Sequence, residues 1–176
     1  MRLSCPIEWT RNYLKSYFEE KNLSEKATRE WDPMVTISHR GNINGPNVDM
    51  ENSPAYVIEA LREGYDVEID VWYLNKKWYL GHDDPQYEIK IDFLKNEKFW
   101  CHAKNMDALF EMSKHPDIHY FWHQNDDVTL TSKGYLWTFP GKKLCDRSVS
   151  VLPEIDYNDL EKCYGICSDF IESFRK

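Results

Sequence analysis

The chain has 176 residues, 41% of them hydrophobic and 30% charged, and its formal net charge is −8. This length suits a single domain, and the apolar residues suffice for a packed core, which excludes wholesale disorder. The acidic balance excludes a protein that attracts nucleic acid through a general basic field.

No apolar run reaches the roughly 18 residues of a membrane span, and Met1 to Thr10 lacks the apolar core of a secretory signal. Five cysteines, an odd number without a paired pattern, occur at positions 5, 101, 145, 163 and 167. Reduced thiols are therefore expected rather than a disulfide framework. Together these features predict a cytoplasmic protein without a transmembrane segment, and they carry no signal for an oligomeric state.

The first predicted element is an amphipathic helix over residues 8–20. Trp9, Tyr13 and Tyr17 recur at helical spacing, while the opposite face is charged with mixed signs. The stretch that follows, as far as Asp32, is polar and reads as a linker. We therefore divide the chain into 1–32, a helix and linker packed on the domain, and 33–176, the main domain.

A strand, a helix and a second strand come next. Residues 34–38 are apolar and β-branched and run into a loop, which is typical of a buried strand. Ser53 and Pro54 supply an N-cap and a first-turn proline for a helix that extends to Glu63, where Gly64 fits the residue after the cap. Residues 65–73 then alternate as a strand, so the segment predicts a parallel βαβ unit.

The rest of the chain repeats this rhythm. A short hairpin arm is expected at 78–81, and helices are expected at 106–114 and around 157–162. Further strands are expected at 99–102, 119–123, 135–138, 148–152 and 164–167. Alternating strands and helices, with polar groups after the strands, indicate an α/β fold with its site at the carboxyl edge of a parallel sheet. We expect a compact or reduced (β/α) TIM-type barrel with an N-terminal helix.

Two carboxylates, Glu68 and Asp70, lie on one face of the predicted strand 65–73. Two salt bridges to lysine or arginine, or a solvated edge strand, would account for them. The apolar residues between and beside them argue against an edge strand, and unpaired buried charge is prohibitive. A divalent cation bound through oxygen ligands is the better interpretation.

Two histidines, His39 and His82, each follow an apolar strand directly and precede flexible residues. A lone histidine in such a place is more often an ordinary surface residue, but this pair brackets the two carboxylates. One imidazole could remove a proton from a nucleophile while the other, as imidazolium, donates to a leaving oxygen. A metal between them would neutralise charge on a phosphoryl group.

The order and separation of four motifs resemble the glycerophosphodiester phosphodiesterase family, within the phospholipase-C-like phosphodiesterase superfamily. The motifs are His39-Arg40-Gly41, Glu51-Asn52-Ser53, Glu68-x-Asp70-Val71 and His82-Asp83. They cover about the first half of the main domain, and Gly165 to Asp169 resembles the family's last strand more weakly. The resemblance implies a (β/α) barrel that cleaves phosphodiesters with a divalent metal, commonly Mg²⁺ or Ca²⁺.

The resemblance also implies a role for each motif. His39 and His82 would be the acid and base, Glu68 and Asp70 would bind the metal, and Arg40 would hold the phosphate. In the family, a hydroxyl of the substrate can attack phosphorus and give a cyclic phosphate. Two more residues, Glu51 and Asn52, would order the loop and helix behind the site.

The chain departs from the family at the third strand, which normally carries an acidic residue two positions before a lysine. Here the stretch reads His102-Ala103-Lys104. Lys104 keeps the phosphate contact that the resemblance implies, and His102 could replace the carboxylate as third ligand. An imidazole would shift the metal preference toward Mn²⁺, Zn²⁺ or Fe²⁺. Alternatively, His102 bonds a neighbouring side chain and the metal takes a water instead.

Four other residues are candidates for supporting the site or contacting substrate: Asp83, His123, Asn125 and Trp137. For His123 and Asn125, loop capping is an equally good interpretation, and Trp137 could as well pack in the core.

The sequence thus predicts a metal-dependent phosphodiester hydrolase or lyase that uses two histidines as general acid and base. Its partner would be a small-molecule or lipid phosphodiester, similar to a glycerophosphodiester or a lysophospholipid, and not nucleic acid. The alternative is a catalytically inactive protein that binds phosphate and metal on the same fold.

Overall fold

The computed structural model describes residues 34–156, 160 and 163–175. The chain divides into two units, Met1–Pro33 and Met34–Lys176, and all described residues belong to the second. The predicted helix at 8–20 and its linker lie outside the described residues, as does most of the predicted helix around 157–162.

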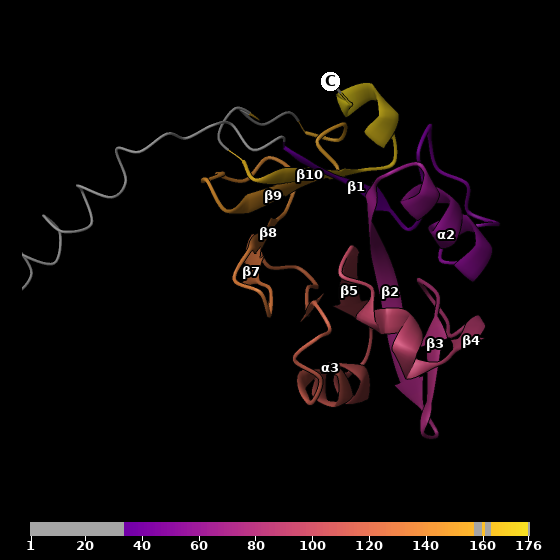
Figure 1. The fold of residues 1–176 in the computed structure, drawn as a ribbon. Helices are drawn as coiled ribbons and strands as arrows, with labels where there is room; N and C mark the ends of the chain where they lie inside the picture. Colours follow the sequence, from indigo (N-terminus) through magenta and orange to yellow (C-terminus); the bar gives the residue numbers. More distant parts are fainter. Residues whose placement is uncertain (1–33, 157–159, 161–162, 176) are drawn as a thin grey trace, which may run out of the picture. The chain divides into compact units, whose positions relative to one another are not determined.

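The second unit is mostly β-sheet (Figure 1). In chain order the strands are β1 (Val35–His39), β2 (Asp66–Leu74), β3 (Lys77–Leu80), β4 (Tyr87–Ile89), β5 (Phe99–Ala103), β6 (Tyr120–Phe121), β7 (Val128–Leu130), β8 (Leu136–Thr138), β9 (Ser148–Val151) and β10 (Gly165–Ser168). The α-helices of the described residues are α2 (Pro54–Arg62) and α3 (Met106–Ser113), and two short 3₁₀ helices are η1 (Ile91–Lys95) and η3 (Ile171–Phe174). Every strand predicted from the sequence is present, whereas β4 and β7 were not predicted.

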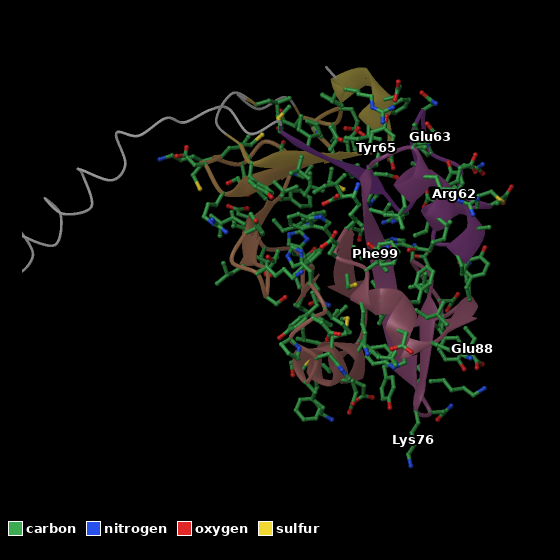
Figure 2. All side chains as sticks on the ribbon, in the orientation of Figure 1. Arg62, Glu63, Tyr65, Lys76, Glu88 and Phe99 are labelled. Atoms are coloured by element: carbon green, nitrogen blue, oxygen red, sulfur yellow. The ribbon has the colours of Figure 1, made fainter. Side chains whose placement is uncertain are left out.

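Seven strands form a parallel series in the order β6-β5-β2-β1-β10-β9-β8. Three others, β3, β4 and β7, pair antiparallel. Along one edge β2 changes partner: it pairs with β1 as far as Glu68 and with β3 from Val71 onward. Figure 2 shows Lys76 at the tip of the hairpin that joins β2 to β3, where Asn75 and Lys76 have φ of 51° and 64°.

The predicted TIM-type barrel is wrong. The sheet is a curled, open sheet of mixed strands, and β6 and β8, the outer members of the parallel series, share no ladder in the described part of the chain. Only β1 to β2 and β5 to β6 are connected through an α-helix there. A ring of eight strands and eight helices takes about 250 residues, and this chain replaces most crossover helices with hairpins and short loops.

The capping residues predicted for α2 explain where that helix begins and ends. The Ser53 hydroxyl accepts from the Tyr56 N–H, Pro54 occupies the first turn, and Gly64 follows the cap with φ of 100°. In α3, the Asn105 side chain accepts from the Ala108 N–H at 3.0 Å. Both helices bury small or apolar residues against β2 and β5, since these belong to one core cluster.

The two faces of the sheet carry different cores. One cluster joins the helices to the apolar side chains of β2 and β5, including Val67, Ile69 and Phe99. The opposite cluster is aromatic and contains Trp100, Phe121 and Trp137. The Phe121 and Trp137 rings lie 4.6 Å apart, so side chains fill the space between β6 and β8, where no backbone ladder runs.

The C-terminal turn is tied to the start of β2. The Tyr65 hydroxyl donates to the Glu172 carboxylate, and the Arg175 guanidinium lies 4.6 Å from the centre of the Tyr65 ring. No helix among the described residues combines the length and apolarity that crossing a membrane would take.

Candidate active site

Polar side chains from four neighbouring parallel strands and one hairpin arm meet at the carboxyl edge of the sheet. Parallel strands bring their carboxyl ends to the same edge, so residues distant in sequence become neighbours there. His39 ends β1, and its register partner in β2 is Glu68. Asp70, two residues further along β2, is paired with His102 of β5.

Glu68, Asp70 and His102 form a compact group that could hold a metal ion, with one ligand atom from each lying within 4.8 Å of the others. Nδ1 of His102 is 3.1 Å from Oδ1 of Asp70 and 3.6 Å from Oε1 of Glu68. The two carboxylates are 1% and 0% exposed, so both have lost their hydration and need compensating charge.

The His102 ring has a fixed orientation. Its Nε2 lies 2.8 Å from the backbone carbonyl of His123, and its plane is within 8° of the Phe121 ring. Because a carbonyl only accepts, Nε2 carries a hydrogen and Nδ1 faces the two carboxylates. Burial lowers the pKa of His102, but the carboxylates of Asp70 and Glu68 outweigh it and raise that pKa to about 9.

Asp70 is the most heavily surrounded group of the site. Its Oδ2 accepts from Nδ2 of Asn52 at 2.9 Å, while Nε of Arg40 lies 3.0 Å away. Nζ of Lys104 is 3.4 Å from Oδ1. Burial would raise the pKa of Asp70, but the two histidines and the guanidinium beside it hold that pKa well below its usual range. The salt-bridge interpretation of the carboxylate pair therefore applies to Asp70.

Glu68 is different, because its Oε2 is buried and has no hydrogen-bond partner among the described residues. The approach to that oxygen from Nε2 of His39, at 3.9 Å, is too long for a hydrogen bond. A buried carboxylate oxygen left in this way is costly. The same holds for Oδ1 of Asp70, whose contacts do not have hydrogen-bond geometry.

His39 is paired with Asp169, which follows β10. Nδ1 of His39 donates to Oδ1 of Asp169 at 2.7 Å, and Asn42 donates to the same oxygen at 2.8 Å. Burial lowers the pKa of His39, but Asp169 and Glu68 raise it above its ordinary value. Since Nδ1 is committed to Asp169, Nε2 is the nitrogen left to exchange a proton.

The sequence did not single out Asp169 or Asn42 as site residues. Ser38 is the register partner of Ser168, so the next residue of each strand, His39 and Asp169, emerges side by side. Oε1 of Glu154 accepts from the Asp169 N–H and the Ser168 hydroxyl, both at 3.0 Å. Only the pairing of β1 with β10 could have revealed this contact, apart from the weak likeness of Gly165 to Asp169 to the family's last strand.

Arg40, His82 and Lys104 lie together beside Asp70. Nη2 of Arg40 is 3.3 Å from Nε2 of His82, and Nζ of Lys104 is 3.3 Å from Nδ1 of His82. Nη1 of Arg40 donates to Glu51 at 3.1 Å. The side chain of His82 is 39% exposed, against 18% for Arg40 and 17% for Lys104, so the two cations lie just behind a partly exposed histidine, where they would attract an anion.

The backbone at the end of β1 is strained where it delivers Arg40. This residue has φ of 55°, in the left-handed region that costs a side-chain-bearing residue about 1–2 kcal/mol. Gly41 follows with φ of 95°, and a Cβ there would lie 2.6 Å from the Tyr56 ring. The tight turn brings the guanidinium back over Asp70.

The remaining predicted residues lie further out or contribute differently. Asp83 is exposed, 3.6 Å from Nε2 of His82, and Asn125 is exposed in the following loop. The His123 imidazole bonds the Asp126 carbonyl, so its link to the site is its own backbone carbonyl. Trp137 is buried against Phe121 in the aromatic core.

Comparison with protein families, curated proteins and solved structures gave no match. The likeness to glycerophosphodiester phosphodiesterases therefore rests on the motifs of the chain itself.

Proposed function

We propose that this chain is a metal-dependent phosphodiester hydrolase or lyase. One observation carries the proposal: a buried pair of carboxylates has a histidine next to each member. His39 lies beside Glu68, and His82 lies 3.2 Å from Oδ2 of Asp70. Two proton-transferring groups around one cation site are what an in-line displacement at phosphorus needs.

The residues present fit a divalent cation. Oε2 of Glu68 and Oδ1 of Asp70 are buried oxygens for which the described part of the chain offers no hydrogen-bond partner. The network contains the carboxylates of Glu51, Glu68, Asp70 and Asp169. Its permanent cations are Arg40 and Lys104, so two negative charges remain when the histidines are neutral. A divalent ion on Glu68, Asp70 and His102 would balance them and supply Lewis acidity toward a phosphoryl oxygen.

The side chains divide the remaining work. Arg40 and Lys104 bind the non-bridging oxygens of the phosphodiester and stabilise the charge that develops on them. Nε2 of His39 takes the proton of the attacking hydroxyl as the new P–O bond forms, and Asp169 stabilises the resulting imidazolium. His82, half-exposed and next to Asp70, gives a proton to the oxygen that leaves phosphorus.

The substrate we propose is a glycerophosphodiester or a lysophospholipid-like diester, and the four sequence motifs are the support for it. When a hydroxyl of the substrate itself attacks, the product is a cyclic phosphate, and when water attacks, the product is a monoester. Cys101, Cys145 and Cys167 are free thiols within the described part of the chain, and we propose a cytoplasmic location for the protein.

The test is a panel of glycerophosphodiesters, lysophospholipids and a chromogenic phosphodiester, each assayed with Mg²⁺, Ca²⁺, Mn²⁺ and Zn²⁺. We expect turnover in the wild type and its loss in His39→Ala and Glu68→Ala. Matched controls are His115→Ala, in the turn after α3, and Glu88→Ala, an exposed partner of Lys77. If phosphate compounds bind but no diester turns over with any metal, the chain is an inactive phosphate- and metal-binding protein and the enzyme proposal fails.

A further inference from the structure

We propose that His102 binds the metal through Nδ1, and that the His123 carbonyl fixes it in this tautomer, so that the site selects Zn²⁺ over Mg²⁺ and Ca²⁺. This inference rests on the metal site of the proposed function. It adds which atom of His102 is the ligand, which backbone group holds that atom in place, and which class of cation the site retains.

The orientation of the ring comes first. Nε2 of His102 donates to the His123 carbonyl at 2.8 Å. The ring also stacks on Phe121, with centroids 5.1 Å apart and planes 8° from parallel. The hydrogen bond at Nε2 and the stacking on Phe121 fix the His102 ring, so that its Nδ1 edge faces the carboxylates. A carbonyl behind a ligating imidazole fixes its tautomer and raises its basicity.

One separation at Nδ1 matches that of two ligands sharing one small ion, and a second is slightly longer. Two atoms each about 2.1 Å from a metal, at angles between about 90° and 110°, lie roughly 3.0–3.4 Å apart. Nδ1 of His102 is 3.1 Å from Oδ1 of Asp70 and 3.6 Å from Oε1 of Glu68. Oδ1 of Asp70 has no hydrogen-bond partner among the described residues, so a cation bound there would compete only with the ion-pair contacts of His102 and Lys104.

The donor set then determines the class of ion. Mg²⁺ and Ca²⁺ are hard cations that bind through oxygen, and their affinity rises with the number of carboxylates. Here one of three protein ligands is a neutral nitrogen, which suits Zn²⁺ and neighbouring first-row ions. A carboxylate at position 102 would return the site to oxygen ligands only.

The experiment measures metal binding itself. The full-length protein is stripped with a chelator, and its dissociation constants for Zn²⁺, Mg²⁺ and Ca²⁺ are determined by titration calorimetry and indicator competition. We expect the wild type to prefer Zn²⁺ by at least about 1,000-fold, and His102→Asp to lose at least about 30-fold of that preference. His115→Asp, the same substitution at a histidine in the turn after α3, should leave the preference unchanged.

A second readout needs no variant. In Zn²⁺-saturated protein with ¹⁵N-labelled histidine, long-range ¹H–¹⁵N spectra should show His102 with hydrogen on Nε2 and a metal-shifted Nδ1. Hydrogen on Nδ1 in the saturated protein would overturn the proposal, as would a Zn²⁺ to Mg²⁺ preference that does not change in His102→Asp. Folding of each variant is checked by near-ultraviolet circular dichroism.

The two proposals fail in different ways. Zn²⁺ bound through Nδ1 without turnover of any diester leaves this inference standing and removes the phosphodiesterase proposal. Turnover supported equally by Mg²⁺ in wild type and His102→Asp leaves the phosphodiesterase and removes the inference.

Discussion

His39 donates its Nδ1 hydrogen to Asp169, 130 residues further along the chain, with 2.7 Å between the two atoms. The contact crosses the ladder between β1 and β10, and Asn42 and Glu154 hold Asp169 from two other directions. Burial opposes the charge on Asp169, but His39 next to it keeps its pKa below the ordinary value. The pair has the arrangement of a base and the carboxylate that orients it.

Asp169→Asn tests this pair. An amide oxygen can still accept from Nδ1, but it cannot stabilise an imidazolium, so we expect kcat to fall by about 100-fold or more with little change in KM. The measurement is steady-state kinetics with saturating metal. Asp117→Asn, an exposed site near Lys95, is the control. An unchanged kcat in Asp169→Asn would mean that His39 is not the base.

Asn52 is expected to be a stability determinant. It is fully buried with φ of 62°, its Nδ2 donates to Asp70, and its Oδ1 accepts from the Asp70 N–H, both at 2.9 Å. Asn52→Ala should lower the free energy of unfolding by about 2–4 kcal/mol, because it leaves buried groups of Asp70 unpaired and strains the backbone.

A comparison with Asn52→Gly separates these two causes. Glycine tolerates the left-handed conformation, so this variant should be about 1 kcal/mol less destabilised than Asn52→Ala, although it loses the same hydrogen bonds. Urea unfolding of the two variants gives the difference. Equal stability of the two would show that the backbone conformation contributes nothing.

The Glu68 carboxylate should be needed for the metal to stabilise the fold. Glu68→Gln replaces one of the three proposed ligand groups with a neutral amide. Saturating Zn²⁺, at about 100 times Kd, should stabilise the wild type by roughly 2.7 kcal/mol and the variant far less. Thermal unfolding with and without a chelator measures both effects. Equal stabilisation of both proteins by the metal would place the ion elsewhere.

His119 should make the fold sensitive to acid. It is buried beside Trp100, with Nε2 2.8 Å from the Thr131 hydroxyl, and burial lowers its pKa from 6.5 to about 4. The unfolded chain therefore binds a proton before the folded one does. The stability contributed by neutral His119 is present above pH 6.5 and is lost as the pH falls toward 4.

The size of that loss is on the order of 1–3 kcal/mol. It is measured from urea unfolding between pH 7 and 4.5, where His119→Gln should flatten the pH dependence. A wild type and a His119→Gln variant with parallel pH profiles would contradict the assignment.

Local patterns in the sequence predicted the helices and strands well, but they did not predict that the sheet stays open. The alternation in β2 correctly separated Glu68 and Asp70 from the apolar face, and Ser53, Pro54 and Gly64 correctly delimited α2. The missed strands, β4 and β7, have three residues each and little buried surface, so they lack a hydrophobic pattern. Whether a sheet closes depends on strand neighbours and crossover lengths, which periodicity does not encode.

The sequence correctly predicted the site residues that lie in or just after β1, β2, β3 and β5. Asp169 was missed because its meeting with His39 depends on β1 pairing with β10, at opposite ends of the described chain. His123 illustrates a different limit: sequence patterns identify side chains, and the group that touches His102 is a backbone carbonyl.

The change of partner along β2 has a consequence for how such a site can diversify. His39 is set by the ladder between β1 and β2, whereas His82 follows β3, whose ladder with β2 begins at Val71. A one-residue insertion in the hairpin around Asn75 and Lys76 would displace His82 and leave His39, Glu68 and His102 where they are. The distance between His39 and His82 is thus separately adjustable. Under the proposed function, this one exposed turn would set the size of the leaving alcohol that fits between them.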